Sequence, residues 1–205
     1  MNRETRRLLV DGPAGAIECA IDEPADAARG VVVICHPHPQ FGGTMDNKVV
    51  QTLARAFLQR GYRAVRFNFR GIGASAGSWD EGRGEVDDAL AVLAAQRDAA
   101  LPLALAGFSF GGYVAATAAQ RLAAAGTPVE RLALVAPATS RFQVPAVPAD
   151  TVVVHGEADD VVPLTATLDW ARPQALPVIV LPGVGHFFHG QLTLLKNQVV
   201  QAWHR

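Results

Sequence analysis

The stretch LALAGFSFGGYVAATAAQRL, residues 103–122, joins an apolar run to a helix-forming run through a serine flanked by glycines. We predict a strand at residues 103–107 and a helix at residues 110–125, which Gly126 ends. Between them GFSFG, residues 107–111, matches the pattern G-x-S-x-G, whose small residues let backbone atoms come close at a sharp, strained turn. The helix N-terminus then presents free N–H groups to a developing negative charge. The pattern predicts Ser109 as a nucleophile at the tip of this turn.

Strand-forming and helix-forming segments alternate on both sides of this stretch. Residues 31–35, VVVIC, form an unbroken β-branched run that is typical of a strand covered on both faces. Further strands are predicted at residues 64–69, 132–136, 151–155 and 177–181, and further helices at residues 47–60, 84–98, 163–171 and 191–203. We expect Asp46 to cap the helix at 47–60 and Gly61 to end it.

Strands separated by helices need crossover connections, so the chain predicts one α/β domain over residues 1–205. Its central sheet should be mostly parallel, with helices on both faces. Residues 5–22 indicate one or two weaker strands, arranged as an antiparallel hairpin around residues 11–15. In such sheets the chemistry gathers beyond the carboxyl ends of the strands, so candidate residues are sought there.

The composition excludes several classes of protein. The 205 residues are 50% hydrophobic and 18% charged, below the about 25% of an average domain, which argues against disorder, coiled coil and collagen. A net charge of −1 without long charged blocks argues against nucleic-acid binding. No apolar run approaches the about 20 residues of a membrane span, and the first residues show no secretion signal. Two cysteines make no disulfide framework. We therefore expect a cytoplasmic enzyme.

The pattern G-x-S-x-G occurs a second time, around Ser75, in residues 73–77. Here it leads into the polar segment SWDEG, residues 78–82, and not into a helix. We interpret Ser75 as a serine of a flexible loop. The preceding residues 71–73, GIG, are a weak match to a dinucleotide-binding loop, because no helix opens at the third glycine.

A serine hydroxyl is a poor nucleophile and needs a base, which in turn needs an orienting acid. The loops after the last two predicted strands hold the candidates for both. These candidates are Glu157, Asp159, Asp160, His186 and His189. The chain order of serine, acid and histidine, each on a loop at one edge of the sheet, is the order found in one large class of enzymes.

Because the serine, the acid and the histidine follow predicted strands in this order, the chain from Val31 to its end resembles the α/β-hydrolase superfamily. The segments HPHP, residues 36–39, and FGGTMDNK, residues 41–48, are similar to small bacterial members near dienelactone hydrolases and esterases. The resemblance implies a serine hydrolase with Ser109 as nucleophile. The family pattern G-x-x-D implies Asp159 as the acid, and the family's histidine matches His186. Asp160 is then expected to cap the helix at 163–171, Glu157 to be solvated, and His189 to lie at the rim or to cap the last helix.

An oxyanion hole needs backbone N–H donors aimed at the developing charge. The residue directly after the nucleophile, Phe110, is expected to supply one. The second should come from the loop after residues 31–35, where Pro37 and Pro39 have no N–H to offer. The family's His-Gly-x turn implies His38, although proline stands here where the family has glycine. The alternatives are Gln40 and Phe41.

Cys35, His36 and His38 raise the possibility of a metal site. Alternate residues of a strand point to opposite faces, and no fourth ligand stands at a suitable spacing, so we expect neither a metal nor a cofactor. A cysteine at the end of an apolar strand is typical of inert core. Aromatic residues gather at the predicted strand ends, and among them we expect Phe41 to line a substrate pocket.

The connection between the strands at 132–136 and 151–155 is short. Its fourteen residues, 137–150, include three prolines and cannot form a cap or lid domain. The site should therefore be open and shallow. Burial of apolar surface contributes about 25 cal/mol per Å², and an open, shallow site buries little of a long acyl chain. The site therefore favours small esters or thioesters over lipids.

We accordingly expect two-step acyl transfer on a small-molecule ester, without nucleic-acid or membrane partners, by a monomer or a homodimer. Two alternatives stay open. The same three side chains could cleave amides or transfer the acyl group to another acceptor. The scaffold could also be a non-catalytic protein that binds a small ligand, because fold alone does not prove activity.

Overall fold

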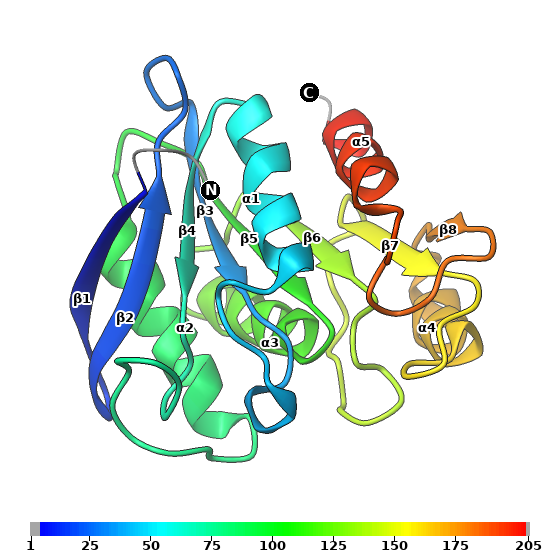
Figure 1. The fold of residues 1–205 in the computed structure, drawn as a ribbon, viewed down its shortest axis with the longest axis horizontal. Helices are drawn as coiled ribbons and strands as arrows, with labels where there is room; N and C mark the ends of the chain where they lie inside the picture. Colours follow the sequence, from blue (N-terminus) through cyan, green and yellow to red (C-terminus); the bar gives the residue numbers. More distant parts are fainter. Residues whose placement is uncertain (1–4, 204–205) are drawn as a thin grey trace.

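The computed structural model describes residues 5–203, in which eight strands form one sheet of order β1-β2-β4-β3-β5-β6-β7-β8 (Figure 1). The strands are β1 (Arg6–Gly12), β2 (Gly15–Asp22), β3 (Gly30–Cys35), β4 (Tyr62–Phe67), β5 (Leu103–Phe108), β6 (Arg131–Val135), β7 (Val152–Gly156) and β8 (Ile179–Leu181). The helices are α1 (Lys48–Gln59), α2 (Arg83–Gln96), α3 (Phe110–Ala124), α4 (Leu164–Ala171) and α5 (Leu192–Ala202), with one-turn segments η1 (Pro39–Phe41) and η2 (Arg172–Gln174).

The sheet has the mostly parallel topology that the alternation of strands and helices predicts. Strands β3 to β8 pair in parallel, and β1 and β2 add an antiparallel hairpin at the edge next to β4. The hairpin closes with Gly12 opposite Gly15, where it was expected. The predicted single-domain α/β fold is therefore confirmed.

Helices cover both faces of the sheet. Alternate residues of β3 point to opposite sides: Val31 and Val33 pack with α2 and α3, whereas Val32 and Ile34 pack with α1 and α5. Figure 1 shows α1 and α5 on the near side of the strands and α2 and α3 behind them. This double cover explains why β3 is buried along its whole length and carries β-branched residues at four of its six positions.

Two expected helix caps are wrong. Helix α1 is capped by Asn47, whose side chain accepts a hydrogen bond from the N–H of Val49 at 2.9 Å. Asp46 forms ion pairs with two arginines instead. No side chain caps α4, which begins after Pro163, so Asp160 does not cap it.

The segment between β6 and β7, residues 136–151, contains no helix. It runs as an irregular loop beside the carboxyl ends of the strands, so this part of the chain has no lid, as its length predicts. Among the helices of residues 5–203, none combines the length and the apolarity that crossing a membrane would require.

Candidate active site

Ser109 occupies the sharp turn between β5 and α3. Its backbone has φ 56° and ψ −118°, a left-handed conformation that is strained for a residue other than glycine. A Cβ atom on Gly107 would lie 2.0 Å from the carbonyl oxygen of Gly111, and one on Gly111 would lie 2.2 Å from that of Cys35. Only glycine fits either position. The G-x-S-x-G pattern therefore forms the turn that the sequence predicts.

The structure brings Ser109, His186 and Asp159 into one chain of hydrogen bonds. His186 Nε2 lies 3.0 Å from Ser109 Oγ, and His186 Nδ1 lies 2.7 Å from Asp159 Oδ2. Because a carboxylate only accepts, Nδ1 carries the proton and donates it to Asp159, which leaves Nε2 to accept from the serine hydroxyl. All three side chains are buried, and Ser109 is 8% exposed.

Asp159 is held by the turn in which it lies. Its Oδ1 accepts from the N–H groups of Val161 at 2.9 Å and Val162 at 2.7 Å, which leaves Oδ2 for His186. Burial alone would raise the pKa of Asp159, but the hydrogen bonds from His186 and from these two N–H groups outweigh burial and hold the pKa below its usual value. The carboxylate is therefore ionised at neutral pH.

The other candidate residues of these loops lie elsewhere. Glu157 and Asp160 are exposed, and Glu157 accepts from the N–H of Gly183 at 2.9 Å. His189 is also exposed. One neighbour of Asp159 was not foreseen. The buried His155 places its Nε2 3.4 Å from Asp159 Oδ2, while it donates to the carbonyl of Val162 at 2.9 Å.

Ser75 is not the flexible-loop serine that was expected. It is buried, accepts from the N–H of Glu18 at 2.9 Å and donates to the carbonyl of Asn68 at 2.7 Å. The Ser75 hydroxyl thus both accepts and donates a hydrogen bond, and the two bonds connect the loop after β4 to strand β2 of the hairpin. The second G-x-S-x-G match is a structural turn.

Two backbone N–H groups beside Ser109 have no acceptor within residues 5–203. They belong to Phe110, the first residue of α3, and to His38, in the loop after β3. These are the two donors that the sequence analysis expects for an oxyanion hole. Of the two alternatives, Phe41 already donates its N–H to the carbonyl of His38 at 3.1 Å, and Gln40 is exposed and does not line the cavity over Ser109.

His36 orients the peptide that carries the His38 N–H. Its Nε2 accepts from the N–H of Phe69 at 3.0 Å, so its proton is on Nδ1, which donates to the carbonyl of Pro37 at 2.6 Å. The Pro37 carbonyl and the His38 N–H belong to one planar trans peptide, and they point in opposite directions. The His38 N–H is thereby turned away from the ring. Burial lowers the pKa of His36 to about 4 and keeps it neutral.

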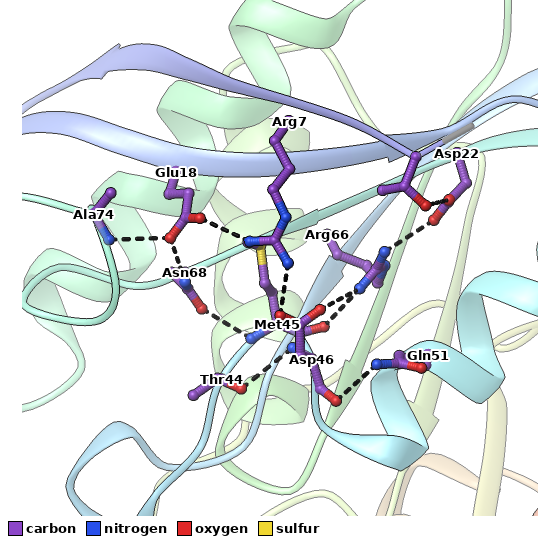
Figure 2. Close-up of polar contacts among 11 residues, drawn as sticks. Arg7, Glu18, Asp22, Thr44, Met45, Asp46, Gln51, Arg66, Asn68 and Ala74 are labelled. Carbon is purple, nitrogen blue, oxygen red and sulfur yellow. Dashed lines mark hydrogen bonds and ion pairs between the residues drawn. The ribbon is translucent and has the colours of Figure 1, made fainter. Parts of the chain in front are cut away.

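A partly buried polar network holds the other end of the loop after β3, at Met45 and Asp46 (Figure 2). The N–H of Met45 donates to Asn68 Oδ1 at 2.9 Å, and its carbonyl accepts from Arg66 Nη1 at 3.1 Å. Arg66 is 2% exposed and pairs with Asp22 and Asp46, each at 3.0 Å. The loop from His36 to Asn47 is therefore held at both ends.

A cavity of about 380 Å³ opens over Ser109 and His186. Most of its wall is apolar, and Phe41, 77% exposed, stands at its mouth. The irregular loop after β6 contributes Arg141 and Phe142, which sequence reasoning missed because this loop has no periodicity. No glutamate or aspartate lines the cavity, and Arg141 is its one permanently charged residue among those described. The Arg141 charge adds to burial in lowering the pKa of His38.

The residues considered for a metal have other surroundings. Cys35 is buried in the core, where burial raises the pKa of its thiol well above the usual value. The ring of His38 packs against Phe41, Trp79 and Phe110 at centroid distances of 4.4 to 5.1 Å. Within residues 5–203, no three histidine, cysteine or acidic side chains are grouped in a way that could hold an ion.

Comparison with known proteins agrees with this fold. Residues 26–147 match the family model described as serine aminopeptidase, S33. A lidless α/β serine hydrolase from Xanthomonas campestris is 38% identical, with a TM-score of 0.89 over 98% of this chain and 94% of that one. An α/β serine hydrolase homologue from Coxiella burnetii is 39% identical, with a TM-score of 0.85 over 100% and 99%.

An uncharacterized protein of Rickettsia prowazekii is 37% identical over 112 residues, which are 53% of this chain and 47% of that protein. The chain thus spans about half the length of this curated relative. Fold and comparisons together define the class as the lidless α/β serine hydrolases. The chain belongs to the α/β-hydrolase family described as serine aminopeptidase, S33.

Proposed function

We propose that this protein hydrolyses small carboxylic esters or thioesters through an acyl-enzyme on Ser109. The observation that carries the proposal is the Ser109–His186–Asp159 hydrogen-bond chain, at 3.0 and 2.7 Å, at the base of an open apolar cavity. The N–H groups of Phe110 and His38 beside it complete the requirements for acyl transfer.

In the first half of the reaction, Ser109 Oγ attacks the ester carbonyl carbon while His186 Nε2 takes the hydroxyl proton. Asp159 stabilises the imidazolium that forms. The carbonyl oxygen becomes an oxyanion and accepts hydrogen bonds from the N–H groups of Phe110 and His38. When the bond to the leaving oxygen or sulfur breaks, His186 donates its proton to that atom, and the acyl group stays on Ser109.

In the second half, water repeats the attack. His186 takes a proton from the water as its oxygen adds to the acyl carbon, and the same two N–H groups hold the oxyanion. The bond to Ser109 Oγ then breaks, and His186 returns the proton to the serine. The products are a carboxylic acid and the alcohol or thiol released earlier. The mouth beside Phe41 is open, so water reaches the acyl-enzyme.

The charges around the cavity favour an ester over an aminopeptidase substrate. An aminopeptidase must accept the free α-ammonium group of its peptide, and a carboxylate at the site is the direct way to stabilise that charge. None of the described residues that line the cavity is a carboxylate, and Arg141 would repel an ammonium group. The same wall suits a neutral or anionic ester with a short acyl group.

The proposal is tested with purified protein, p-nitrophenyl esters of increasing acyl length and an aminoacyl p-nitroanilide. We expect hydrolysis of the short esters and little cleavage of the anilide. Ser109→Ala should lower kcat by about 10⁴ or more and abolish labelling by a fluorophosphonate. Ser75→Ala, which changes the other serine of the same pattern, should keep both. Anilide cleavage faster than ester hydrolysis, or a labelled Ser75, would refute the proposal.

A further inference from the structure

A second cavity lies at the opposite edge of the sheet from Ser109, where the parallel strands begin. It measures about 190 Å³, several times the about 30 Å³ that one water molecule occupies in the liquid. Its lining includes Arg29, Arg60, Tyr62, Glu130, Arg131 and Trp203. In Figure 1 the parallel strands begin at the upper edge, where α1 and α5 both end, and the arrowheads of β3, β4 and β5 point away from that edge.

This cavity holds an excess of positive charge. Among the described residues, three arginines line it against one glutamate, and one of the three, Arg131, has its Nε 3.8 Å from a carboxylate oxygen of Asp150. Within residues 5–203, neither Arg29 nor Arg60 forms a hydrogen bond or ion pair through its side chain, and Arg60 Nε is buried without an acceptor. Glu130 is exposed and accepts from the hydroxyl of Tyr62 at 3.0 Å. Arg29 is exposed, so the buried donor without a partner is Arg60 Nε. Such a donor and the neighbouring like charges both cost free energy, which an anion in the cavity would recover.

The wall of the cavity is built from fixed groups. Arg131 lies over the ring of the buried Trp203, 5.1 Å from its centroid, and its Nε donates to the carbonyl of Asp150 at 2.8 Å. The stem of Arg29 packs across Gly61, where a Cβ atom would lie 2.9 Å from Arg29 Cδ. Part of the donor set is thus positioned before any ligand binds, which lowers the entropic cost of binding.

We propose that this cavity binds a small phosphate-bearing anion, either inorganic phosphate or a compact phosphomonoester. A guanidinium presents a planar fork of donors that matches two phosphate oxygens, and three guanidiniums around one cavity can engage several oxygens at once. Within the described part of the chain, the site has no lining residue in common with the cavity over Ser109, so it stands independently of the proposed ester hydrolysis.

The test is isothermal titration of the whole protein with inorganic phosphate and, separately, with glycerol 3-phosphate, at constant ionic strength in a buffer without other oxyanions. We expect one saturable site and a change in tryptophan fluorescence from Trp203. Arg60→Gln should weaken binding about tenfold or more, the effect of one lost charge-assisted hydrogen bond. The matched control is Arg55→Gln, on the exposed side of the same helix, which should bind like the wild type.

Tighter binding of glycerol 3-phosphate would identify a phosphomonoester site, and tighter binding of phosphate an inorganic phosphate site. Arg60→Gln removes no side-chain hydrogen bond within residues 5–203, but it takes a positive charge from the C-terminus of α1, so its melting temperature without phosphate should lie within a few degrees of that of the wild type. If it does not fold, Arg29→Gln serves the same test. Absence of saturable binding, or equal affinities for Arg60→Gln and Arg55→Gln, would overturn the proposal.

Discussion

Replacing Asp159 by asparagine should disable the candidate catalytic chain while leaving its shape intact. In the native protein Oδ1 accepts two backbone N–H groups, at 2.9 and 2.7 Å, and Oδ2 accepts from His186 Nδ1 at 2.7 Å. An amide has one oxygen and one NH₂ group, and only its oxygen can face the two N–H donors. In Asp159→Asn the NH₂ group therefore faces His186.

This orientation changes the tautomer of the histidine. Facing a donor, His186 Nδ1 must accept, so its proton moves to Nε2, which can then no longer take the proton of Ser109. The loss of a base in the correct tautomer lowers kcat by about 10⁴ in enzymes with such a triad. We expect a loss of this order here, with KM for a short p-nitrophenyl ester changed far less, because Asp159 does not line the cavity.

The assay is steady-state ester hydrolysis by wild type and Asp159→Asn, with circular dichroism to show that the fold is retained. Asp160→Asn is the matched control, because it makes the same change one residue away at an exposed position, and it should keep full activity. Activity of Asp159→Asn within about tenfold of the wild type would refute the assignment of Asp159 as the orienting acid.

Three further predictions concern the loop after β3 and its surroundings. His36→Phe should lower kcat more than it changes KM, by up to the about 10²–10³ that a lost oxyanion donor costs; an effect on KM alone in ester kinetics would contradict the role given to this ring. Arg141→Gln should raise the pKa of His38, because a neighbouring positive charge that lowers it is removed; NMR titration of the ring measures this, and an unchanged or lower pKa would speak against it. The ion pairs of Asp46 with its arginines hold its pKa below the unfolded value, so their stabilisation is present above about pH 4 and is lost as the pH falls through the folded-state pKa. Denaturant titrations at pH 7 and pH 3 should therefore show that the free energy of unfolding falls less on acidification for Asp46→Asn than for the wild type. Equal losses in the two proteins would exclude a contribution of these ion pairs to stability.

Local patterns in the sequence are sufficient to predict most of the fold. The turn at Ser109 is predictable because Gly107 and Gly111 are required by contacts within a few residues and with the adjacent strand. The hairpin of β1 and β2 and the alternation of strands and helices depend on equally local signals. For the same reason the strand ends, and thus the loops of Asp159 and His186, are found before the structure is known.

What the sequence does not reveal depends on contacts between distant residues. Asp46 and Asn47 are both good capping residues, and Asp46 is taken from that role by Arg7 and Arg66, which lie far from it along the chain. Ser75 is buried by partners on β2 and after β4, neither of which a local pattern identifies.

The position of Arg141 in the cavity wall follows from the path of an irregular loop. No periodicity encodes that path, because its residues form no helix or strand whose faces could be assigned from the sequence. Phe41 was predictable from the sequence, whereas the places of Arg141 and Phe142 in the wall over Ser109 had to come from the structure.

The contact between β1 and the loop after β3 links the edge of the sheet to a loop that lines the candidate active site. Arg7 on β1 pairs with Asp46 at 2.8 Å and with Glu18 at 2.8 Å (Figure 2). An engineered chain without β1 would leave β2 as an unprotected sheet edge, which invites pairing with another molecule. Among the described residues, Asp46 would then keep one of its two ion-pair partners, Arg66. Self-association and a weaker hold on the Asp46 end of this loop would then arise together, so β1 is a poor place to shorten this enzyme or to graft a binding peptide.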